Sequence, residues 1–183
     1  MKISIFGLGY VGTTSAACFS AMGHEIIGVD IVEEKIEKIN KGISPVYEKG
    51  LDRLLSKAKR DNLIFASKDY KNAVKATELS LICVGTPSLP NGQTDLSFVS
   101  KISEQIAYSL REKSQYHSIV IRSTIPPGTI EDKLIPLIED KSQKIHGKEF
   151  GVSMNPEFLR EGSAFEDFFS PERIIIGCSD QKS

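Results

Sequence analysis

The sequence has few cysteines, no long apolar run and almost no net charge, and each absence excludes a class of protein. Its 3 cysteines are odd in number and show no C-x-x-C spacing, so neither a disulfide framework nor a zinc site is indicated. No run of about 18 apolar residues is present, which argues against a membrane span. With 23 basic and 24 acidic side chains the net charge is −1, so binding to nucleic acid by bulk electrostatics is not expected.

The N-terminus and the length set the expected location and the number of domains. One lysine precedes a short apolar run, without the longer apolar region of a signal peptide. We therefore expect a cytoplasmic protein with reduced thiols. A chain of 183 residues is typical of one domain, so residues 1–183 are interpreted as a single unit.

Short apolar runs alternate with amphipathic segments along the chain. Strands are expected at residues 2–6, 25–29, 63–66, 79–84, 118–121, 150–154 and 173–176, and helices at residues 10–22, 32–39, 51–58, 96–110 and 129–138. Residues 140–148 are expected to form a loop. The alternation predicts an α/β fold of the Rossmann type: a doubly wound, mainly parallel sheet with helices on both faces.

A glycine-rich hexapeptide follows the first expected strand. Gly7, Gly9 and Gly12 fit the pattern G-x-G-x-x-G in the strand-then-helix context that gives the pattern its meaning. Gly7 can make the tight turn, Gly9 lets the backbone approach a pyrophosphate, and Gly12 lets the helix pack against the strand. The helix N-terminus then offers N–H groups to the phosphates. The alternative is that the glycines serve strand–helix packing alone.

An acidic residue and a lysine follow the second expected strand. Asp30 lies 18 residues after Gly12, where a carboxylate hydrogen-bonds the ribose of a bound dinucleotide. Because that carboxylate repels a 2′-phosphate, the sequence favours NAD over NADP. Lys35, one helical turn further on, can reach the same ribose or a phosphate; an exposed lysine on a helix surface explains its position equally well.

Two threonines and two glutamates follow later strands. Thr86 and Thr124 come after the strands at residues 79–84 and 118–121, where their hydroxyls can reach a cofactor or simply begin turns. Glu157 and Glu161 lie four residues apart, a spacing that places both carboxylates on one face of a helical turn. Such a pair can do acid–base chemistry beside a nicotinamide, or it can be a solvated acidic surface.

Four ordered motifs, at residues 7–12, 84–87, 122–128 and 155–162, together resemble the UDP-glucose/GDP-mannose dehydrogenase family. The likeness extends from residue 1 to about residue 177, with smaller matches at Pro45, Glu48, Gly50, Gly92 and Asp95. Residues 111–124 look more like the GDP-mannose dehydrogenases, and residues 171–173 look more like the UDP-glucose branch. The resemblance therefore implies a nucleotide-sugar substrate, either GDP-mannose or UDP-glucose.

The resemblance also implies roles for individual residues. Enzymes of this family oxidise the C6 alcohol of a nucleotide sugar to a carboxylate with two NAD, through a thiohemiacetal and a thioester on a cysteine. Six residues match the family's NAD-contacting positions: Tyr10, Val11, Asp30, Lys35, Thr86 and Thr124. By the same resemblance Thr124 helps to position the catalytic water, Glu157 is the acid–base residue and Glu161 lies where cofactor and substrate meet. The full-length enzyme is expected to be a homodimer or a larger homo-oligomer.

The family's catalytic cysteine belongs to a later motif, which this sequence does not contain. Cys18, Cys83 and Cys178 lack its surroundings and are interpreted as small buried hydrophobic residues. We therefore expect the N-terminal NAD-binding domain of a longer enzyme, without the central helix and the sugar-binding domain, able to bind NAD but inactive alone. Two alternatives stay open: a non-enzymatic NAD-sensing module and another NAD-dependent dehydrogenase of the hydroxyacid type. Neither requires a segment like residues 155–162.

Overall fold

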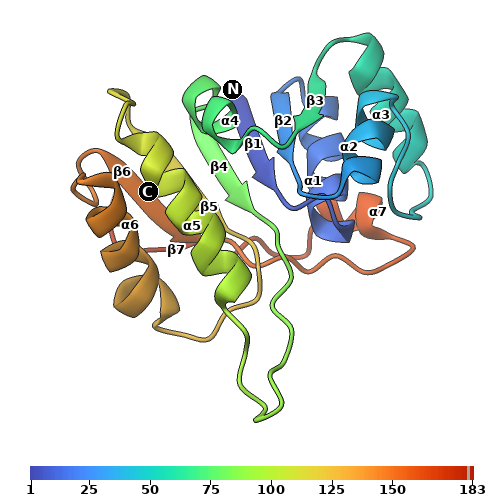
Figure 1. Ribbon diagram of the computed structural model, residues 1–183. Helices are drawn as coiled ribbons and strands as arrows, with labels where there is room; N and C mark the ends of the chain where they lie inside the picture. The colour runs from blue at the N-terminus through green and yellow to red at the C-terminus, as the bar shows by residue number, and fades with distance from the viewer. Residues whose placement is uncertain (181) are drawn as a thin grey trace.

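A twisted sheet between two layers of helices forms the body of the protein (Figure 1). The computed structural model describes residues 1–180 and 182–183, and in these residues the sheet has the strand order β3-β2-β1-β4-β5-β6-β7. Six strands run parallel: β1 (Lys2–Phe6), β2 (Glu25–Val29), β3 (Ile64–Ser67), β4 (Leu79–Ile82), β5 (His117–Ile121) and β6 (Phe150–Met154). The short β7 (Gly177–Cys178) pairs antiparallel with β6. The predicted doubly wound α/β fold is confirmed.

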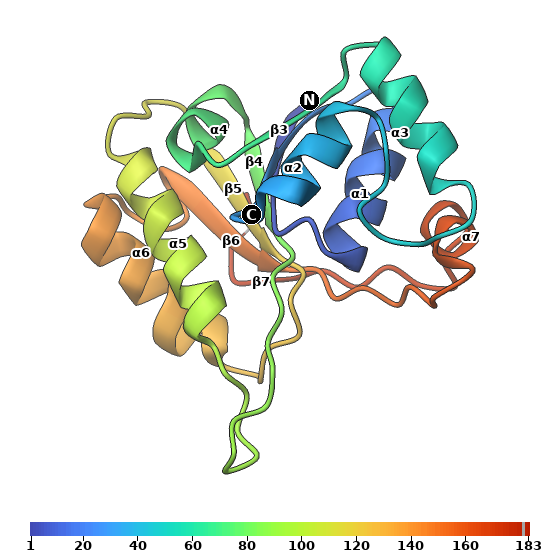
Figure 2. The same cartoon turned by 45° about the vertical axis from the view of Figure 1, so that its right-hand side comes forward.

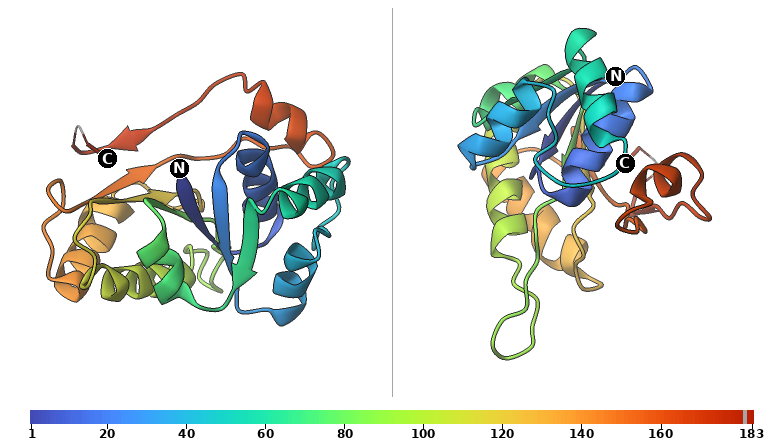
Figure 3. Two further views of the ribbon diagram at one scale, coloured as in Figure 1. Left: turned by 90° about the horizontal axis from the view of Figure 1, so that it is seen from above. Right: turned by 90° about the vertical axis from the view of Figure 1, so that its right-hand side faces the viewer.

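The helices cover the two faces of the sheet separately (Figure 2). One face carries α1 (Tyr10–Ala21), α2 (Glu33–Asn40) and α3 (Leu51–Arg60). The other carries α4 (Tyr70–Ala76), α5 (Ser97–Leu110) and the π-helical turn η1 (Ile130–Leu134), which continues into α6 (Ile135–Ser142). The small helix α7 (Ala164–Phe169) packs on α1, and Figure 3 shows it on the α1 side of the sheet.

Two apolar cores follow from the alternation of side chains along the strands. Ile3 and Ile5 of β1 are buried against the α1–α3 layer, whereas Phe6 is buried against the α4–α6 layer. Both faces are therefore apolar, which explains why the strands appear in the sequence as continuous hydrophobic runs. Each fully buried side chain of this size contributes about 1.5–3 kcal/mol to the stability of the fold.

Most expected elements are present, and the differences have local causes. The strand expected at residues 173–176 is wrong: β7 begins only at Gly177. In the register of β6 with β7, Met154 faces Gly177, so residues 175 and 176 would have to pair beside Pro156, which has no N–H to donate. The Asn155 side chain bonds the Ile175 carbonyl oxygen at 2.8 Å instead. The loop expected at residues 140–148 begins late because α6 continues to Ser142, and α4 and α7 were not expected.

A buried polar chain closes the edge of the sheet where the parallel strands begin. The Lys113 ammonium group donates to the carbonyl oxygens of Val74 at 2.8 Å and of Thr77, and it lies 2.9 Å from His117 Nδ1. An ammonium group has three N–H bonds and accepts none, so Nδ1 is the acceptor. His117 Nε2 must then carry the proton and donate to Ser80 Oγ, 2.8 Å away. This chain ties α4, β4 and β5 together and fixes His117 as a neutral ring.

We expect the free energy of unfolding to fall in mild acid because of His117. Burial, and next the charge of Lys113, lower the pKa of His117 from 6.5 to about 3. The unfolded chain therefore takes up a proton that the folded chain refuses, so stability is intact above pH 6.5 and is lost as the pH falls toward 3. At pH 5 the loss from this residue amounts to about 2 kcal/mol.

The measurement is urea unfolding of the wild type and His117→Gln at pH 7 and pH 5. A glutamine can still accept from Lys113 and donate to Ser80 but does not titrate, so its stability should depend less on pH. The other histidines, His24 and His146, are the same in both proteins. Equal losses in the two proteins would contradict the role given to His117.

Candidate functional site

Glycine stands at the three positions of the hexapeptide for different structural reasons. Gly7 has φ +91°, and a Cβ there would also lie 2.9 Å from the Cys83 carbonyl oxygen. A Cβ on Gly12 would lie 1.8 Å from the Gly7 carbonyl oxygen, so only glycine lets α1 approach the end of β1 this closely. The space around Gly9 is open, with no atom within 4 Å of where its Cβ would be. The first and third glycines thus shape the loop, and the second leaves room beside it.

The start of α1 is free to bind an anion. Gly9 is the N-cap and offers no side-chain acceptor to the first turn. The earliest hydrogen bond of the helix runs from Thr13 N to the Gly9 carbonyl oxygen at 2.9 Å. The amides of Tyr10, Val11 and Gly12 therefore have no acceptor within the helix, and the helix dipole adds partial positive charge. This open cradle fits the pyrophosphate of a dinucleotide, as the sequence predicts.

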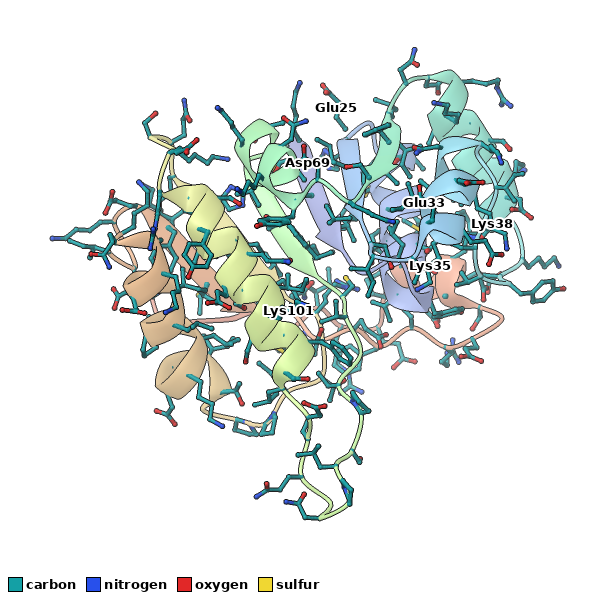
Figure 4. All side chains as sticks on the ribbon, viewed as in Figure 1. Glu25, Glu33, Lys35, Lys38, Asp69 and Lys101 are labelled. Atoms are coloured by element: carbon teal, nitrogen blue, oxygen red, sulfur yellow. The ribbon has the colours of Figure 1, made fainter. Side chains whose placement is uncertain are left out.

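Asp30 lies beside this cradle, at the carboxyl end of β2. Its Oδ2 accepts the Leu8 N–H at 2.7 Å and its Oδ1 accepts the Val32 N–H at 2.9 Å. Lys35 Nζ lies 3.4 Å from Oδ2, and Figure 4 shows Lys35 on α2. The two residues expected to contact the adenosine ribose are therefore neighbours, and the carboxylate is anchored to the glycine loop itself.

Thr86 and Thr124 meet at the same edge of the sheet, beyond β4 and β5. The Thr86 hydroxyl donates to the Thr124 carbonyl oxygen at 2.7 Å, so the two strand ends are joined. The Thr124 residue itself is exposed. In a doubly wound sheet ligands bind beyond the carboxyl ends of the strands, so both threonines lie where a cofactor can reach them.

The expected helical turn at residues 157–161 is wrong. Residues 155–160 form no helix, and three turn residues precede α7. The cause is local competition for backbone N–H groups. Glu157 accepts the N–H of Leu159 at 2.6 Å, and Asp167 accepts the N–H of Arg160 at 2.9 Å. Glu157 is half-buried and Glu161 is exposed, so the two carboxylates lie in different surroundings.

Arg122 is a residue of this region that the sequence did not single out. It is half-buried, and its Nη1 donates to Asn155 Oδ1 at 2.6 Å. Burial lowers the pKa of Arg122, an effect that the nearby Cys83 and Glu157 partly offset. The Arg122 guanidinium and the Glu157 carboxylate thus lie near each other, and both line the same cavity. The sequence could have indicated Arg122, because this residue directly follows β5 and ligands bind beyond the carboxyl ends of the strands in such sheets.

A cavity of about 600 Å³ lies between α1 and residues 155–174. Arg122 and Glu157 line it, together with Phe19 of α1, Met22 directly after α1 and Phe168 of α7. None of the residues expected to bind the cofactor lines this cavity. The cofactor cradle lies instead at the carboxyl edge of the sheet, at the start of α1, whereas Glu157 lines the cavity.

The three thiols differ in accessibility. Cys18 and Cys83 are buried, as expected, and burial raises the pKa of each to about 12. At neutral pH both are therefore thiols rather than nucleophilic thiolates. Cys178 was also expected to be buried, but it is exposed because it lies on the short edge strand β7. In residues 1–180 and 182–183 no group of three or more histidine, cysteine, aspartate or glutamate side chains is placed to hold a metal ion.

The geometry agrees with comparisons to known proteins. The family model for the NAD-binding domain of the UDP-glucose/GDP-mannose dehydrogenase family matches residues 1–183. The chain belongs to this family. Its cofactor is NAD, and the glycine loop, the free amides of α1 and Asp30 have the arrangement that NAD requires. In the described residues no helix is long and apolar enough to cross a membrane.

Individual family members are closely similar to this chain. GDP-mannose 6-dehydrogenase of Pseudomonas aeruginosa is 48% identical over all 183 residues, and UDP-glucose 6-dehydrogenase AglM of Haloferax volcanii is 38% identical. The chain spans 42% of the length of each of these relatives. A crystal structure of a ternary complex of GDP-mannose dehydrogenase from P. aeruginosa superposes with a TM-score of 0.97 at 49% identity, covering 98% of this chain and 41% of that one.

Two glycine substitutions should separate folding from binding. Gly12→Ala places a methyl group against the Gly7 carbonyl oxygen and should cost about 3 kcal/mol or more of folding free energy. Gly9→Ala, at φ −80° in open space, should change stability by less than about 0.5 kcal/mol while weakening NADH binding. Thermal unfolding and NADH fluorescence titration measure the two effects. Equal stability of the two variants would contradict the close approach of α1 to β1.

Proposed function

We propose that this chain is the cofactor half of a nucleotide-sugar 6-dehydrogenase, which oxidises the C6 alcohol of GDP-mannose or UDP-glucose to the carboxylate. The observation that carries the proposal is the placement of residues 155–162. Gly162, at the end of this segment, donates to Glu48, which also accepts from Tyr10, the first residue of α1, so the end of the segment that follows Glu161 lies close to the dinucleotide cradle. NAD, when bound, supplies the hydride acceptor; acid–base groups beside it must come from the chain.

Each site residue has a role that its position supports. The amides of α1 bind the pyrophosphate, and Asp30 with Lys35 holds the adenosine ribose. Thr86 and Thr124 line the nicotinamide side of the edge, where the Thr124 hydroxyl can orient a water molecule. Glu157 accepts and returns the proton of the sugar alcohol or the water, and Glu161 lies where the sugar nucleotide meets the cofactor.

GDP-mannose is the favoured substrate within this proposal. Six curated GDP-mannose 6-dehydrogenases are 46% to 49% identical to this chain, whereas the UDP-glucose 6-dehydrogenase of H. volcanii is 38% identical. The proposed cofactor-binding residues do not select the base or the sugar of the substrate. The full-length enzyme, and not this chain alone, is therefore the protein in which to compare the two substrates and determine the homo-oligomeric state.

The chain should bind NADH much more tightly than NADPH. Both Asp30 oxygens are fixed by backbone N–H groups, so the carboxylate cannot turn away from a 2′-phosphate. Asp30→Asn keeps one acceptor oxygen but removes the charge, and it should narrow the preference by about tenfold or more. Asp52→Asn, on α3, is the matched control. Fluorescence titration with both cofactors tests this, and equal affinities in the wild type would reject the role of Asp30.

The pure 183-residue chain should bind NAD but form no sustained NADH with either sugar nucleotide. The four-electron reaction needs a nucleophilic thiolate at the nicotinamide. Cys18 and Cys83 are buried with raised pKa values, and Cys178 lies on β7. Absorbance of NADH with millimolar GDP-mannose or UDP-glucose provides the assay. Sustained turnover would overturn this expectation, and its loss in Cys178→Ser would identify the thiol responsible.

A further inference from the structure

Glu48 joins three segments that are far apart in the sequence. It lies in the connection between α2 and α3, and its Oε2 accepts two hydrogen bonds. One comes from the Tyr10 hydroxyl at 2.6 Å, and the other from the Gly162 N–H at 2.8 Å. Tyr10 is the first residue of α1, and Gly162 directly follows Glu161. A single carboxylate oxygen thus bridges the start of α1, at the cofactor cradle, and the segment at residues 155–162, which carries Glu157 and Glu161.

The burial of Glu48 makes these two bonds important. The residue is only 7% exposed. Within residues 1–180 and 182–183 no ion pair includes Glu48, so hydrogen-bond donors rather than a cation stabilise its charge. A buried carboxylate that loses a donor is left with an unsatisfied charge, so both donors are held firmly.

A backbone conformation and a second contact orient the two donors. Gly162 has φ +87°, a backbone conformation that suits glycine, and it turns its N–H toward Glu48. The Tyr10 hydroxyl also lies 3.4 Å from the Arg160 carbonyl oxygen, which brings residues 160–162 as a group against the start of α1. Burial, followed by the bond to Glu48, raises the pKa of Tyr10, so its hydroxyl remains a donor at neutral pH.

We propose that Glu48 is a positioning residue that fastens the segment carrying Glu157 and Glu161 to the start of α1, and so couples the order of this segment to occupation of the cofactor cradle. Glu48 accepts from Tyr10 and Gly162 and acts through these two residues. The functional meaning of this coupling rests on the proposed function. The attachment of residues 155–162 to the start of α1 through Glu48 does not depend on that function.

Amide hydrogen exchange at Gly162, followed by ¹⁵N NMR, tests the proposal directly. In Glu48→Ala the Gly162 amide loses its acceptor and should exchange at least tenfold faster. Glu48→Gln retains an acceptor oxygen and should keep most of the protection, and Tyr10→Phe should have an intermediate effect. The control is Glu34→Ala, on the exposed surface of α2, which should leave Gly162 unchanged. Circular dichroism establishes that each variant is folded.

Saturating NADH provides the readout that separates coupling from simple stabilisation. In the wild type NADH should slow Gly162 exchange at least threefold, and in Glu48→Ala this slowing should disappear while NADH binds several-fold more weakly. Unchanged Gly162 exchange in folded Glu48→Ala, or in Tyr10→Phe if the alanine variant does not fold, would overturn the fastening. NADH-dependent slowing that persists in Glu48→Ala would overturn the coupling. Failure of the wild type to bind NADH would instead refute the proposed function and leave the exchange results interpretable.

Discussion

The contact between Gly12 and the Gly7 carbonyl oxygen determines the geometry on which the site depends. Because no Cβ intervenes, α1 begins directly against the end of β1. That closeness places the free amides of Tyr10 and Val11 at the carboxyl edge of the sheet and directs the Tyr10 hydroxyl toward Glu48. It also buries Cys18 on the inner side of the helix, which makes this thiol unreactive. A single close approach therefore sets up the binding site and removes a competing nucleophile.

The two ends of the sheet manage their polar groups in opposite ways. At the edge where the parallel strands begin, Lys113, His117 and Ser80 satisfy one another in a closed, buried chain. At the carboxyl edge, the first amides of α1 are left without intramolecular acceptors, and Thr124 is exposed. Unsatisfied groups are tolerable there only because solvent or a ligand can reach them. The closed edge thus contributes to stability, and the open edge is available for binding.

The sequence was most informative where a pattern is local. The strand at residues 2–6, its glycine loop and Asp30 could be predicted because spacing and turn chemistry act over a few residues. The helical turn expected from the spacing of Glu157 and Glu161 is wrong, because side-chain acceptors determine the backbone conformation there. The bridge of Glu48 lay beyond prediction from the residues alone: its partners are 38 and 114 positions away, and only the folded chain brings them together. The exposure of Cys178 likewise depended on where the pairing of β6 stops.

The hydrogen bonds of Asp30 explain how one carboxylate can both hold the glycine loop and, in its proposed role, discriminate between NAD and NADP. Its oxygens are fixed by the N–H groups of Leu8 and Val32 before any ligand arrives. In the proposed role of Asp30, a ribose meets acceptors that are already oriented, and little ordering is needed on binding. The same anchoring prevents the carboxylate from turning away from a 2′-phosphate, and rotation would break the bond that holds the glycine loop. Lys35, 3.4 Å away, is already paired with Asp30 and is not free to compensate the added charge fully. The proposed discrimination against the phosphorylated cofactor thus depends on the same bonds that shape the pyrophosphate cradle.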